Sequence, residues 1–365
     1  MISYGKEELC LIWIDSFIGL EYKHKERLLE IIEENPKIPA IVESAKEYLI
    51  DEVGENEYNT IKNSATKEYL DFILSEYDKK GVKIITKLSP DYPKEFEDIT
   101  CPPICIYYKG NKNILSGNLF GIVGSRKSLP SSLNIAKNYT EQLSAAGFTL
   151  VTGIAEGVDG AVLRAALDCG GKMISIIAGG FDNIYPKQHA ELVEKVVEKG
   201  LVISEYPPSV VPKPYLFPIR NRMIAGLSCG VLVVSGAIKS GTMYTAEYAN
   251  DFGKDLFAVP YGIGVPSGAG CNELIKKGAM LTDTPSDILE FYGAEKKEDI
   301  KPNLTEEEKS IVKVLSNGEL HIEKISAALK RRVFEITPIL SVLEIKGLVV
   351  KSGNVYALTR NDLEE

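Results

Sequence analysis

The chain has 365 residues, of which 44% are hydrophobic and 25% are charged, as in an ordinary globular protein of two or three domains. Its formal net charge of -9 at pH 7 argues against a protein that coats duplex DNA or an anionic membrane through bulk charge. The N-terminus has no basic segment leading into an apolar run, and no segment approaches the ~20 apolar residues of a membrane span, so we expect a cytoplasmic protein.

The six cysteines are scattered along the chain, at positions 10, 101, 105, 169, 229 and 271. A chain of this length does not depend on disulfides for stability, so reduced thiols are expected. Only Cys101 and Cys105 are close in sequence, and the three histidines offer them no clustered partners. We therefore predict no metal site and no cofactor.

The first region, residues 1–85, is rich in Glu and Lys and has apolar residues at helical spacing. The clearest examples are HKERLLEIIEEN and EYLDFILSEYDKKG. These patterns predict a helical N-terminal domain with a charged, solvated outer face. From about residue 82 the sequence changes to short apolar runs punctuated by Pro and Gly, which predicts a strand-containing lead-in to the next domain.

The central region, a predicted domain at 86–295 with its core at 115–291, alternates strand-like and helical segments. Near-continuous apolar strands that alternate with helices predict an α/β fold with a parallel sheet covered on both faces. Ligands of such sheets bind beyond the carboxyl ends of the strands, so the loops leaving those ends are candidate sites. The predicted strands lie in LFGIVGS, FTLVTG, MISIIAGG, LVISEY, GVLVVSG and DLFAVP.

The last region, residues 301–365, follows the charged spacer GAEKKEDIKPN. Three helical patterns, LTEEEKSIVKVL, HIEKISAALK and ITPILSVLEIKG, precede two short strands in LVVKSGNVYAL, which predicts a winged helix. The helix that would enter a DNA groove exposes Glu335, Ser341, Glu344 and Lys346, whereas a groove reader presents cations. We therefore favour protein contact or structural support for this domain over duplex-DNA binding.

Two common nucleotide-binding motifs are not matched in the central region. The first turn reads GIVGSRKS and the second strand ends LVTG, without the glycine pattern or the acidic residue of a dinucleotide enzyme. In GAIKSGT the lysine, Lys239, precedes the second glycine instead of following it, which argues against a P-loop and against ATP hydrolysis. We predict no catalytic residues.

Glycine-flanked loops nevertheless offer an anion site. The turn that begins at Gly124 and the helix start after Ser240 can each hold a phosphate through backbone N–H groups and the positive end of a helix. Residues 115–290 hold 15 Lys and Arg against 16 Asp and Glu, so a basic groove here would depend on placement and not on composition. The cations in strand-exit loops or helix starts, expected to converge on one sheet edge, are Arg126, Arg220, Arg222 and Lys239.

A series of short motifs resembles the DNA-processing protein A family (DprA, also called Smf) in order and spacing over about residues 88–291. The motifs are DYP, PPICIYYKGN, GIVGSR, VTGIAEGVD, GGFDNIYPKQH, SEYPP, FPIRNRMIAGLS, SGTMYTAEYA, AVPYG and SGAGCNELIKKGA. The most specific of these is FPIRNRMIAGLS, and the predicted winged helix is similar to one found in the same family.

The resemblance implies an extended Rossmann-like, doubly wound domain that dimerises. It also implies a function: binding and protecting incoming single-stranded DNA in natural transformation, and loading the RecA recombinase onto it, with single-strand-binding protein as a possible further partner. The positions that the resemblance implies for phosphate and base contacts are Gly124, Ser125, Arg126, Gly153, Phe217, Arg220, Asn221, Arg222, Lys239, Ser240, Gly241 and Thr242.

The residue chemistry agrees with this assignment. A cationic track with aromatic platforms binds single strands, and each stacked base contributes ~1–3 kcal/mol. Phe217 is as good a candidate for a platform as for a core residue, and Tyr215 and Tyr244 are weaker candidates. The arginines at 220 and 222 offer planar, bidentate phosphate contacts that lysines do not match.

An alternative is a nucleotide-binding protein similar to the nucleoside-monophosphate phosphoribohydrolases, which share this fold. Their signature loop ends in Gly-Thr-x-x-Glu with a catalytic glutamate. Here that position is Thr245, and Glu247 lies about 200° further around the predicted helix. Hydrolysis is therefore the less favoured hypothesis.

Overall fold

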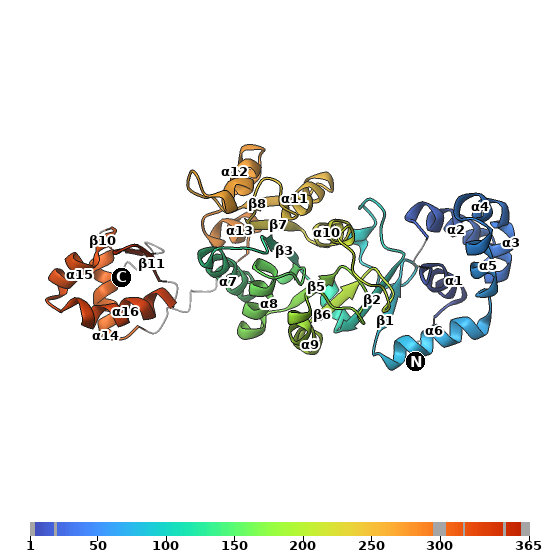
Figure 1. Ribbon diagram of the computed structural model, residues 1–365, viewed down its shortest axis with the longest axis horizontal. Coiled ribbons are helices and arrows are strands. Elements are labelled where there is room, and N and C mark those ends of the chain that lie inside the picture. The colour runs from blue at the N-terminus through green and yellow to red at the C-terminus, as the bar shows by residue number, and fades with distance from the viewer. Residues whose placement is uncertain (1–3, 18–19, 295–303, 317, 346–347, 359–365) are drawn as a thin grey trace. The chain divides into compact units, whose positions relative to one another are not determined.

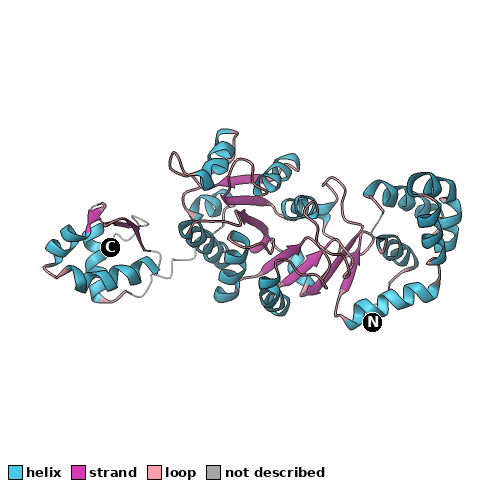
Figure 2. Cartoon of the chain, in the orientation of Figure 1, coloured by secondary structure: helices cyan, strands magenta, loops and turns pink. Residues whose placement is uncertain are grey.

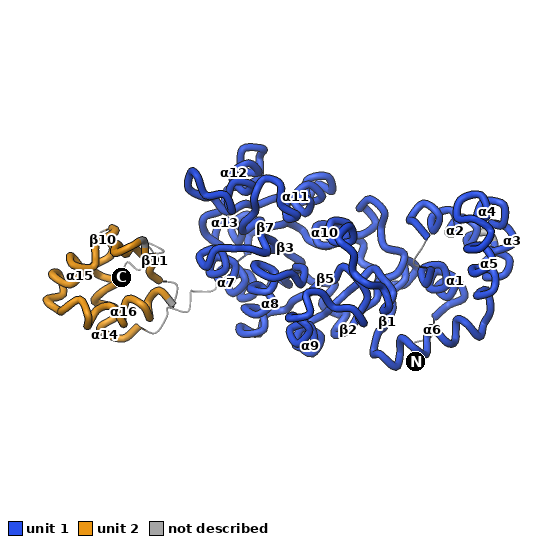
Figure 3. The backbone as a smooth tube through the Cα atoms, viewed as in Figure 1, with its two compact units in different colours: residues 1–297 blue, residues 298–365 orange. Residues whose placement is uncertain are grey.

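The computed structural model describes residues 4–17, 20–294, 304–316, 318–345 and 348–358. The chain forms two compact units, residues 1–297 and 298–365 (Figure 3). The spacer residues 295–303 lie outside the described residues. The domain boundary expected near residue 85 falls inside the first unit and stays a prediction.

The N-terminal part of the first unit is helical, as its sequence pattern predicts (Figure 1). Trp13, the single tryptophan of the chain, is completely buried in its core and donates a hydrogen bond from Nε1 to the carbonyl of Ser64 at 3.0 Å. The helices are α1 (Lys6–Asp15), α2 (Tyr22–Glu34), α3 (Ile38–Ser44), α4 (Lys46–Val53), α5 (Glu55–Asn63) and α6 (Lys67–Lys79).

The central part is built on one sheet, which has nine strands among the described residues, in the order β1-β2-β6-β5-β4-β3-β7-β8-β9 (Figure 2). The strands from β6 to β9 in this order are parallel, whereas β1 and β2 from the lead-in are antiparallel to their neighbours. The bounds are β1 (Lys83–Thr86), β2 (Cys105–Gly110), β3 (Leu119–Gly124), β4 (Thr149–Thr152), β5 (Met173–Ile177), β6 (Leu201–Ser204), β7 (Gly230–Ser235), β8 (Asp255–Ala258) and β9 (Met280–Leu281).

Helices cover both faces of this sheet, which explains why β5 and β7 are buried along their whole length. On one face lie α7 (Pro130–Ala145), α8 (Val158–Cys169), α9 (Ala190–Lys199) and α13 (Pro285–Phe291), and on the other α10 (Leu216–Leu227), α11 (Thr242–Asp251) and α12 (Ala269–Lys276). Short 3-10 helices are η1 (Lys94–Phe96), η2 (Lys112–Ser116), η3 (Lys187–His189) and η4 (Pro266–Gly268). The predicted doubly wound α/β fold is confirmed.

The chain order reverses at the centre of the sheet. From β3 the chain runs through β4, β5 and β6 to one side, and then returns to place β7 on the other side of β3. A crevice beyond the carboxyl ends of the strands forms at such a reversal. The fold therefore directs attention to the loops that leave β3 and β7.

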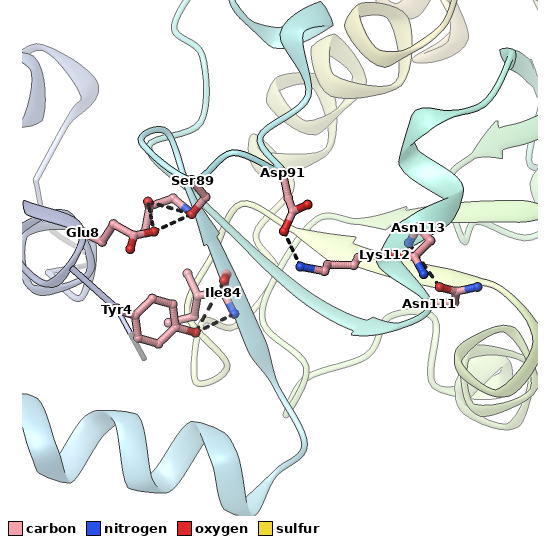
Figure 4. Close-up of polar contacts among 9 residues, drawn as sticks. Tyr4, Glu8, Ile84, Ser89, Asp91, Asn111, Lys112 and Asn113 are labelled. Atoms are coloured by element: carbon pink, nitrogen blue, oxygen red, sulfur yellow. Dashed lines mark hydrogen bonds and ion pairs between the residues drawn. The ribbon is translucent and has the colours of Figure 1, made fainter. Parts of the chain in front are cut away.

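The N-terminal helices are attached to the antiparallel edge of the sheet. The Tyr4 hydroxyl donates to the carbonyl of Ile84 in β1 at 3.4 Å, and Glu8 of α1 accepts from the Ser89 hydroxyl at 2.6 Å (Figure 4). Apolar residues from β1 and β2, among them Ile84 and Tyr107, complete the helical core. The lead-in strands thus belong to both the sheet and the helical core.

A buried ion pair joins the first two helices. Lys25 Nζ of α2 lies 2.7 Å from Asp15 Oδ1 of α1, and Asp15 is only 2% exposed. Burial acts to lower the pKa of Lys25, but the attraction of Asp15 outweighs it and raises that pKa above its usual value. The charged form of the lysine is therefore favoured in the folded protein.

The second unit contains α14 (Glu306–Leu315), α15 (Ile322–Leu329) and α16 (Val333–Ile345). Its antiparallel sheet has the strand order β10-β12-β11, formed by β10 (Leu320–His321), β11 (Val349–Ser352) and β12 (Val355–Leu358). The three helices and the hairpin expected from the sequence are present, and the winged-helix class stays a prediction. Within the described part of the chain, no helix has both the length and the apolarity of a bilayer span.

We expect Lys25→Ala to lower the free energy of unfolding of the first unit by about 3–5 kcal/mol, because it leaves the Asp15 carboxylate buried without its partner. Lys23 of the same helix provides a matched control, since its pair with Glu52 is exposed (60% and 38%) and screened by solvent, so Lys23→Ala should change the free energy of unfolding far less. Urea denaturation followed by Trp13 fluorescence measures both. Equal losses in the two variants would contradict the prediction.

Candidate nucleic-acid interface

The loops that leave β3 and β7 are joined by hydrogen bonds. The Ser125 amide donates to Ser235 Oγ at 3.3 Å, and the hydroxyls of Ser128 and Ser235 lie 2.9 Å apart. The Ser128 hydroxyl also donates to the carbonyl of Ser125 at 2.8 Å. These bonds fix the predicted Gly124–Arg126 turn at the point where the chain order reverses.

Glycine is required where this turn meets the start of α8. Gly157 has a φ of +79°, and a Cβ there would collide with the Ser125 carbonyl. Gly124, a predicted contact residue, packs against Val158, and a Cβ at position 124 would lie 2.9 Å from Val158 Cβ. The absence of side chains at Gly124 and Gly157 therefore lets the turn after β3 pack closely against the start of α8.

Arg220, the first arginine of the FPIRNR segment, lies beneath the site and is only 4% exposed. Its Nη1 donates to the carbonyl of Ile176 at the end of β5, and its Nε donates to Asn221 Oδ1 at 3.2 Å. Its guanidinium occupies the space that a side chain at Gly153 would take, because a Cβ there would lie 2.7 Å from Nη2. Gly153 therefore makes room for Arg220.

Asp159 at the start of α8 accompanies this buried cation. Burial raises the pKa of the Asp159 carboxyl, and the charge of Arg220 and the hydrogen bond from the Ala155 amide partly offset that rise. Burial likewise lowers the pKa of Arg220 to about 10, although Asp159 opposes the shift. Arg220 remains charged at neutral pH and lies beside Asp159 below the loops without being exposed itself.

Asn221 connects α10 to the second glycine-rich loop. Its Nδ2 donates to the carbonyl of Gly241 at 3.2 Å, next to the first residue of α11, Thr242. The Ser240 hydroxyl is buried and has no hydrogen-bond partner among the described residues. The backbone N–H groups at the start of α11 are the donors that suit an anion at this loop.

Arg222 is buried in an ion pair at the carboxyl end of β6, so it does not offer the phosphate contact that the sequence-based expectation gave it. It is 5% exposed, and its Nη2 is paired with Glu205 Oε1 at the end of β6. Burial acts to lower its pKa, but Glu205 outweighs that effect and raises it. Two residues along a helix is a rotation of about 200°, so Arg220 and Arg222 enter different environments. The charge of Arg222 is neutralised inside the protein.

Arg126 and Lys239 are exposed, as a phosphate contact requires. Three further exposed lysines lie in loops leaving the carboxyl ends of parallel strands: Lys127 after β3, Lys187 after β5 and Lys213 after β6. None of these five cations has an ion pair among the described residues. The cations predicted from the sequence, in strand-exit loops and helix starts, do not include these three lysines.

An aromatic surface adjoins the cations. The Arg126 guanidinium lies 4.9 Å from the centre of the Phe217 ring, and Tyr185 packs edge-on against the same ring at 5.7 Å. Phe217 is partly buried, whereas Tyr185 is 54% exposed. Tyr215 and Tyr244 are also exposed. The sequence identified Phe217, but Tyr185 is brought to it only by the fold.

The loop that carries Tyr185 is held from both sides. The Gly180 amide donates to the carbonyl of Val210 at 2.8 Å, and the Asp182 amide to that of Pro208 at 3.0 Å. Lys80, which follows α6, pairs with the Asp182 carboxylate at 2.6 Å, and Phe181 packs against the N-terminal helical core. The N-terminal helices thus support one wall of the candidate site.

The position that carries glutamate in the phosphoribohydrolase signature is Thr245, which is 2% exposed, and Glu247 is exposed on another side of α11. Asp159 is committed to the hydrogen bond from Ala155 at 3.2 Å. Among the described residues, no group of three or more His, Cys, Asp or Glu side chains is arranged to hold a metal ion. The phosphoribohydrolase signature is therefore not matched in α11.

Residues 83–293 match the sequence family described as DNA recombination-mediator protein A. The chain is 36% identical over 233 residues to DNA processing protein DprA of Bacillus subtilis, a match that covers 63% of this chain and 78% of the relative. The X-ray structure of DNA processing protein A from Streptococcus pneumoniae is similar with a TM-score of 0.67 and 30% identity, over 80% of this chain and 98% of that one. DNA processing protein A from Helicobacter pylori, solved to describe its single-stranded DNA binding mode, gives a TM-score of 0.53 and 27% identity, over 58% and 95% of the two chains.

The buried Arg222 and the exposed Arg126 lead to stability predictions of different size. Arg222→Ala should lower the free energy of unfolding by about 3–5 kcal/mol, because Glu205 is left buried and unpaired. Arg126→Ala removes an exposed side chain and one cation–π contact, so a loss of no more than about 1 kcal/mol is expected. Urea unfolding of both variants measures the two free energies. A small loss of stability in Arg222→Ala would show that the pair of Arg222 with Glu205 is not structural.

Proposed function

Because the chain belongs to the DNA recombination-mediator protein A family, we propose that it binds single-stranded DNA at the carboxyl edge of its central sheet. The observation that carries the proposal is the exposed Arg126 guanidinium stacked on Phe217, at the reversal of the sheet. Single strands are bound by cations along the backbone and by aromatic rings that stack with bases. Both components are present here within one set of loops.

The phosphate backbone is assigned to the exposed cations and to the two glycine-rich loops. Arg126 and Lys239 have no ion pair within the described part of the chain, and Ser240 and Gly241 precede the N-terminus of α11. Arg220 is buried below the same edge, with Gly124, Ser125, Gly153 and Asn221 forming the backbone framework. Arg222 is left out of the contact set, because it is paired with Glu205.

The aromatic residues are assigned to the bases. Arg126 already occupies one side of Phe217, so a base stacks either on the guanidinium plane or on the exposed Tyr185 ring beside it. A duplex keeps its bases stacked internally and offers none to these rings. The arrangement therefore favours single strands over duplex DNA.

The finer role follows the family resemblance. We propose that the bound strand is incoming DNA in natural transformation, that the protein protects it and loads RecA onto it, and that a homodimer formed through the Rossmann-like domain is the active form. Single-strand-binding protein is a further proposed partner. The proposed role requires no catalytic residue and no cofactor, and we place the protein in the cytoplasm, where RecA acts.

The single-strand assignment predicts that an Arg126→Ala, Lys239→Ala double variant binds labelled oligo-dT at least about tenfold more weakly, since each charged hydrogen bond is worth about 1.5–3 kcal/mol. Loss of two phosphate contacts should also reduce the salt slope of log K by about 1.4 for a single strand. Fluorescence anisotropy at a series of salt concentrations, with a matched duplex as competitor, measures both quantities.

Lys172→Ala provides the control, because Lys172 is exposed but precedes β5 and so lies at the amino end of the strands. It should bind like wild type. If wild type shows no preference for the single strand, or if the double variant binds as well as Lys172→Ala, the proposed groove is wrong. A nucleoside-monophosphate hydrolysis assay would then test the alternative function.

RecA loading is tested separately, with oligo-dT covered by single-strand-binding protein. Wild type should shorten the lag in RecA ATPase activity on this substrate, whereas the Arg126→Ala, Lys239→Ala variant should not, because it cannot hold the strand that RecA must enter. An unchanged lag with wild type, together with intact single-strand binding, would reject the loading role and leave the binding role standing.

A further inference from the structure

Helix α16 of the second unit is apolar on two opposite faces. Its inner face places Ile336, Leu340 and Leu343 in the core of the unit, each 0% exposed. On the opposite face Phe334 is 66% exposed and Val342 is 42% exposed. Pro338 lies between them and is also exposed, which gives an outer stripe at spacings of four residues.

A helix that is apolar all round is normally buried all round. From Val333 to Glu344 the only charged residues are Glu335 and Glu344. A single exposed phenylalanine needs no explanation, but an aligned stripe on such a helix is typical of an interaction surface. Within the second unit, no other described element packs on this stripe.

The N-terminal end of the stripe is positively charged. Lys330 and Arg332 are exposed and have no ion pair among the described residues, whereas Arg331 is paired with Glu307 at 2.7 Å. The Arg332 guanidinium lies 6.0 Å from the centre of the Phe334 ring. Two available cations therefore adjoin the most exposed apolar side chain of the unit.

We propose that this outer stripe, formed by Phe334, Pro338 and Val342 with Lys330 and Arg332 at one end, docks an acidic peptide segment of a partner protein. Apolar side chains of the peptide cover the stripe, and its carboxylates face the two cations. The proposal is independent of the single-strand site.

Duplex DNA fits this face less well than an acidic peptide does. A helix that reads a groove presents cations along its length, whereas the exposed charged residues within α16 are Glu335 and Glu344. Lys346, which the sequence also places here, lies outside the described residues. The exposed apolar side chains of the stripe would also have no base edges to meet in a groove.

The test starts from a phage-displayed library of random twelve-residue peptides, selected on the immobilised full-length protein. Peptides enriched on wild type should carry Asp or Glu beside Phe, Leu, Ile or Trp. The strongest is then synthesised with a fluorescent label and measured by anisotropy against the wild type and variants. Phe334→Asp and a Lys330→Glu, Arg332→Glu double variant should each weaken its binding at least about tenfold.

Phe72→Asp is the matched control, because Phe72 is 61% exposed on α6 of the first unit and undergoes the same substitution. It should bind the peptide like wild type, and all variants should keep their circular dichroism and oligo-dT affinity. The proposal is overturned if no peptide is enriched, if the enriched peptides are basic, or if Phe334→Asp binds them unchanged. It is also overturned if Phe334→Asp weakens oligo-dT binding or changes the oligomeric state.

Discussion

The buried guanidinium of Arg220 is the constraint on which the carboxyl edge of the sheet depends. It holds the end of β5 through the Ile176 carbonyl, faces the carboxyl of Asp159 at the start of α8, and fills the space left by Gly153 after β4. A charge removed from water in this way is tolerated only where its partners are fixed. The exits of β4 and β5 are therefore held in one arrangement by a residue that has almost no contact with solvent.

The two arginines of the FPIRNR segment have different partners because α10 is covered on two sides. One side faces the sheet, where Arg220 is buried, and the other faces the lead-in segment, where Ile99 packs closely against Gly226. Arg222 points to this second side and is neutralised by Glu205. The asparagine between them spans to Gly241, so that the segment fixes the second anion-binding loop as well. The FPIRNR segment resembles a phosphate-binding motif, but its two arginines have structural roles. The exposed cations that can contact a phosphate come from neighbouring loops.

The support extends beyond the central sheet. Lys80 and the N-terminal helical core hold the loop that carries Tyr185, and the ring of Tyr185 in turn packs against Phe217 under Arg126. This chain of contacts gives the N-terminal helices a physical link to the site, although their own sequence contains no binding motif. The second unit has a separate feature, since the helix α16 has a core face and a second apolar face that no described element of its own unit covers.

The sequence by itself determined the α/β class, the strands from LFGIVGS to DLFAVP and the glycine-rich loops that follow these strands. Strand burial and turn chemistry are local properties, and hydrophobic periodicity and composition indicate them directly. It also determined the family, because the order and spacing of the motifs can be recognised in the sequence itself. Only the tertiary structure decided which cations are available. Arg126, Arg220 and Arg222 are alike in sequence, yet the first is exposed and the others are buried, because burial depends on what packs over a residue from elsewhere in the chain. For the same reason the GGFDNIYPKQH motif did not by itself identify Tyr185 as a contact residue, because only the fold places its ring against Phe217.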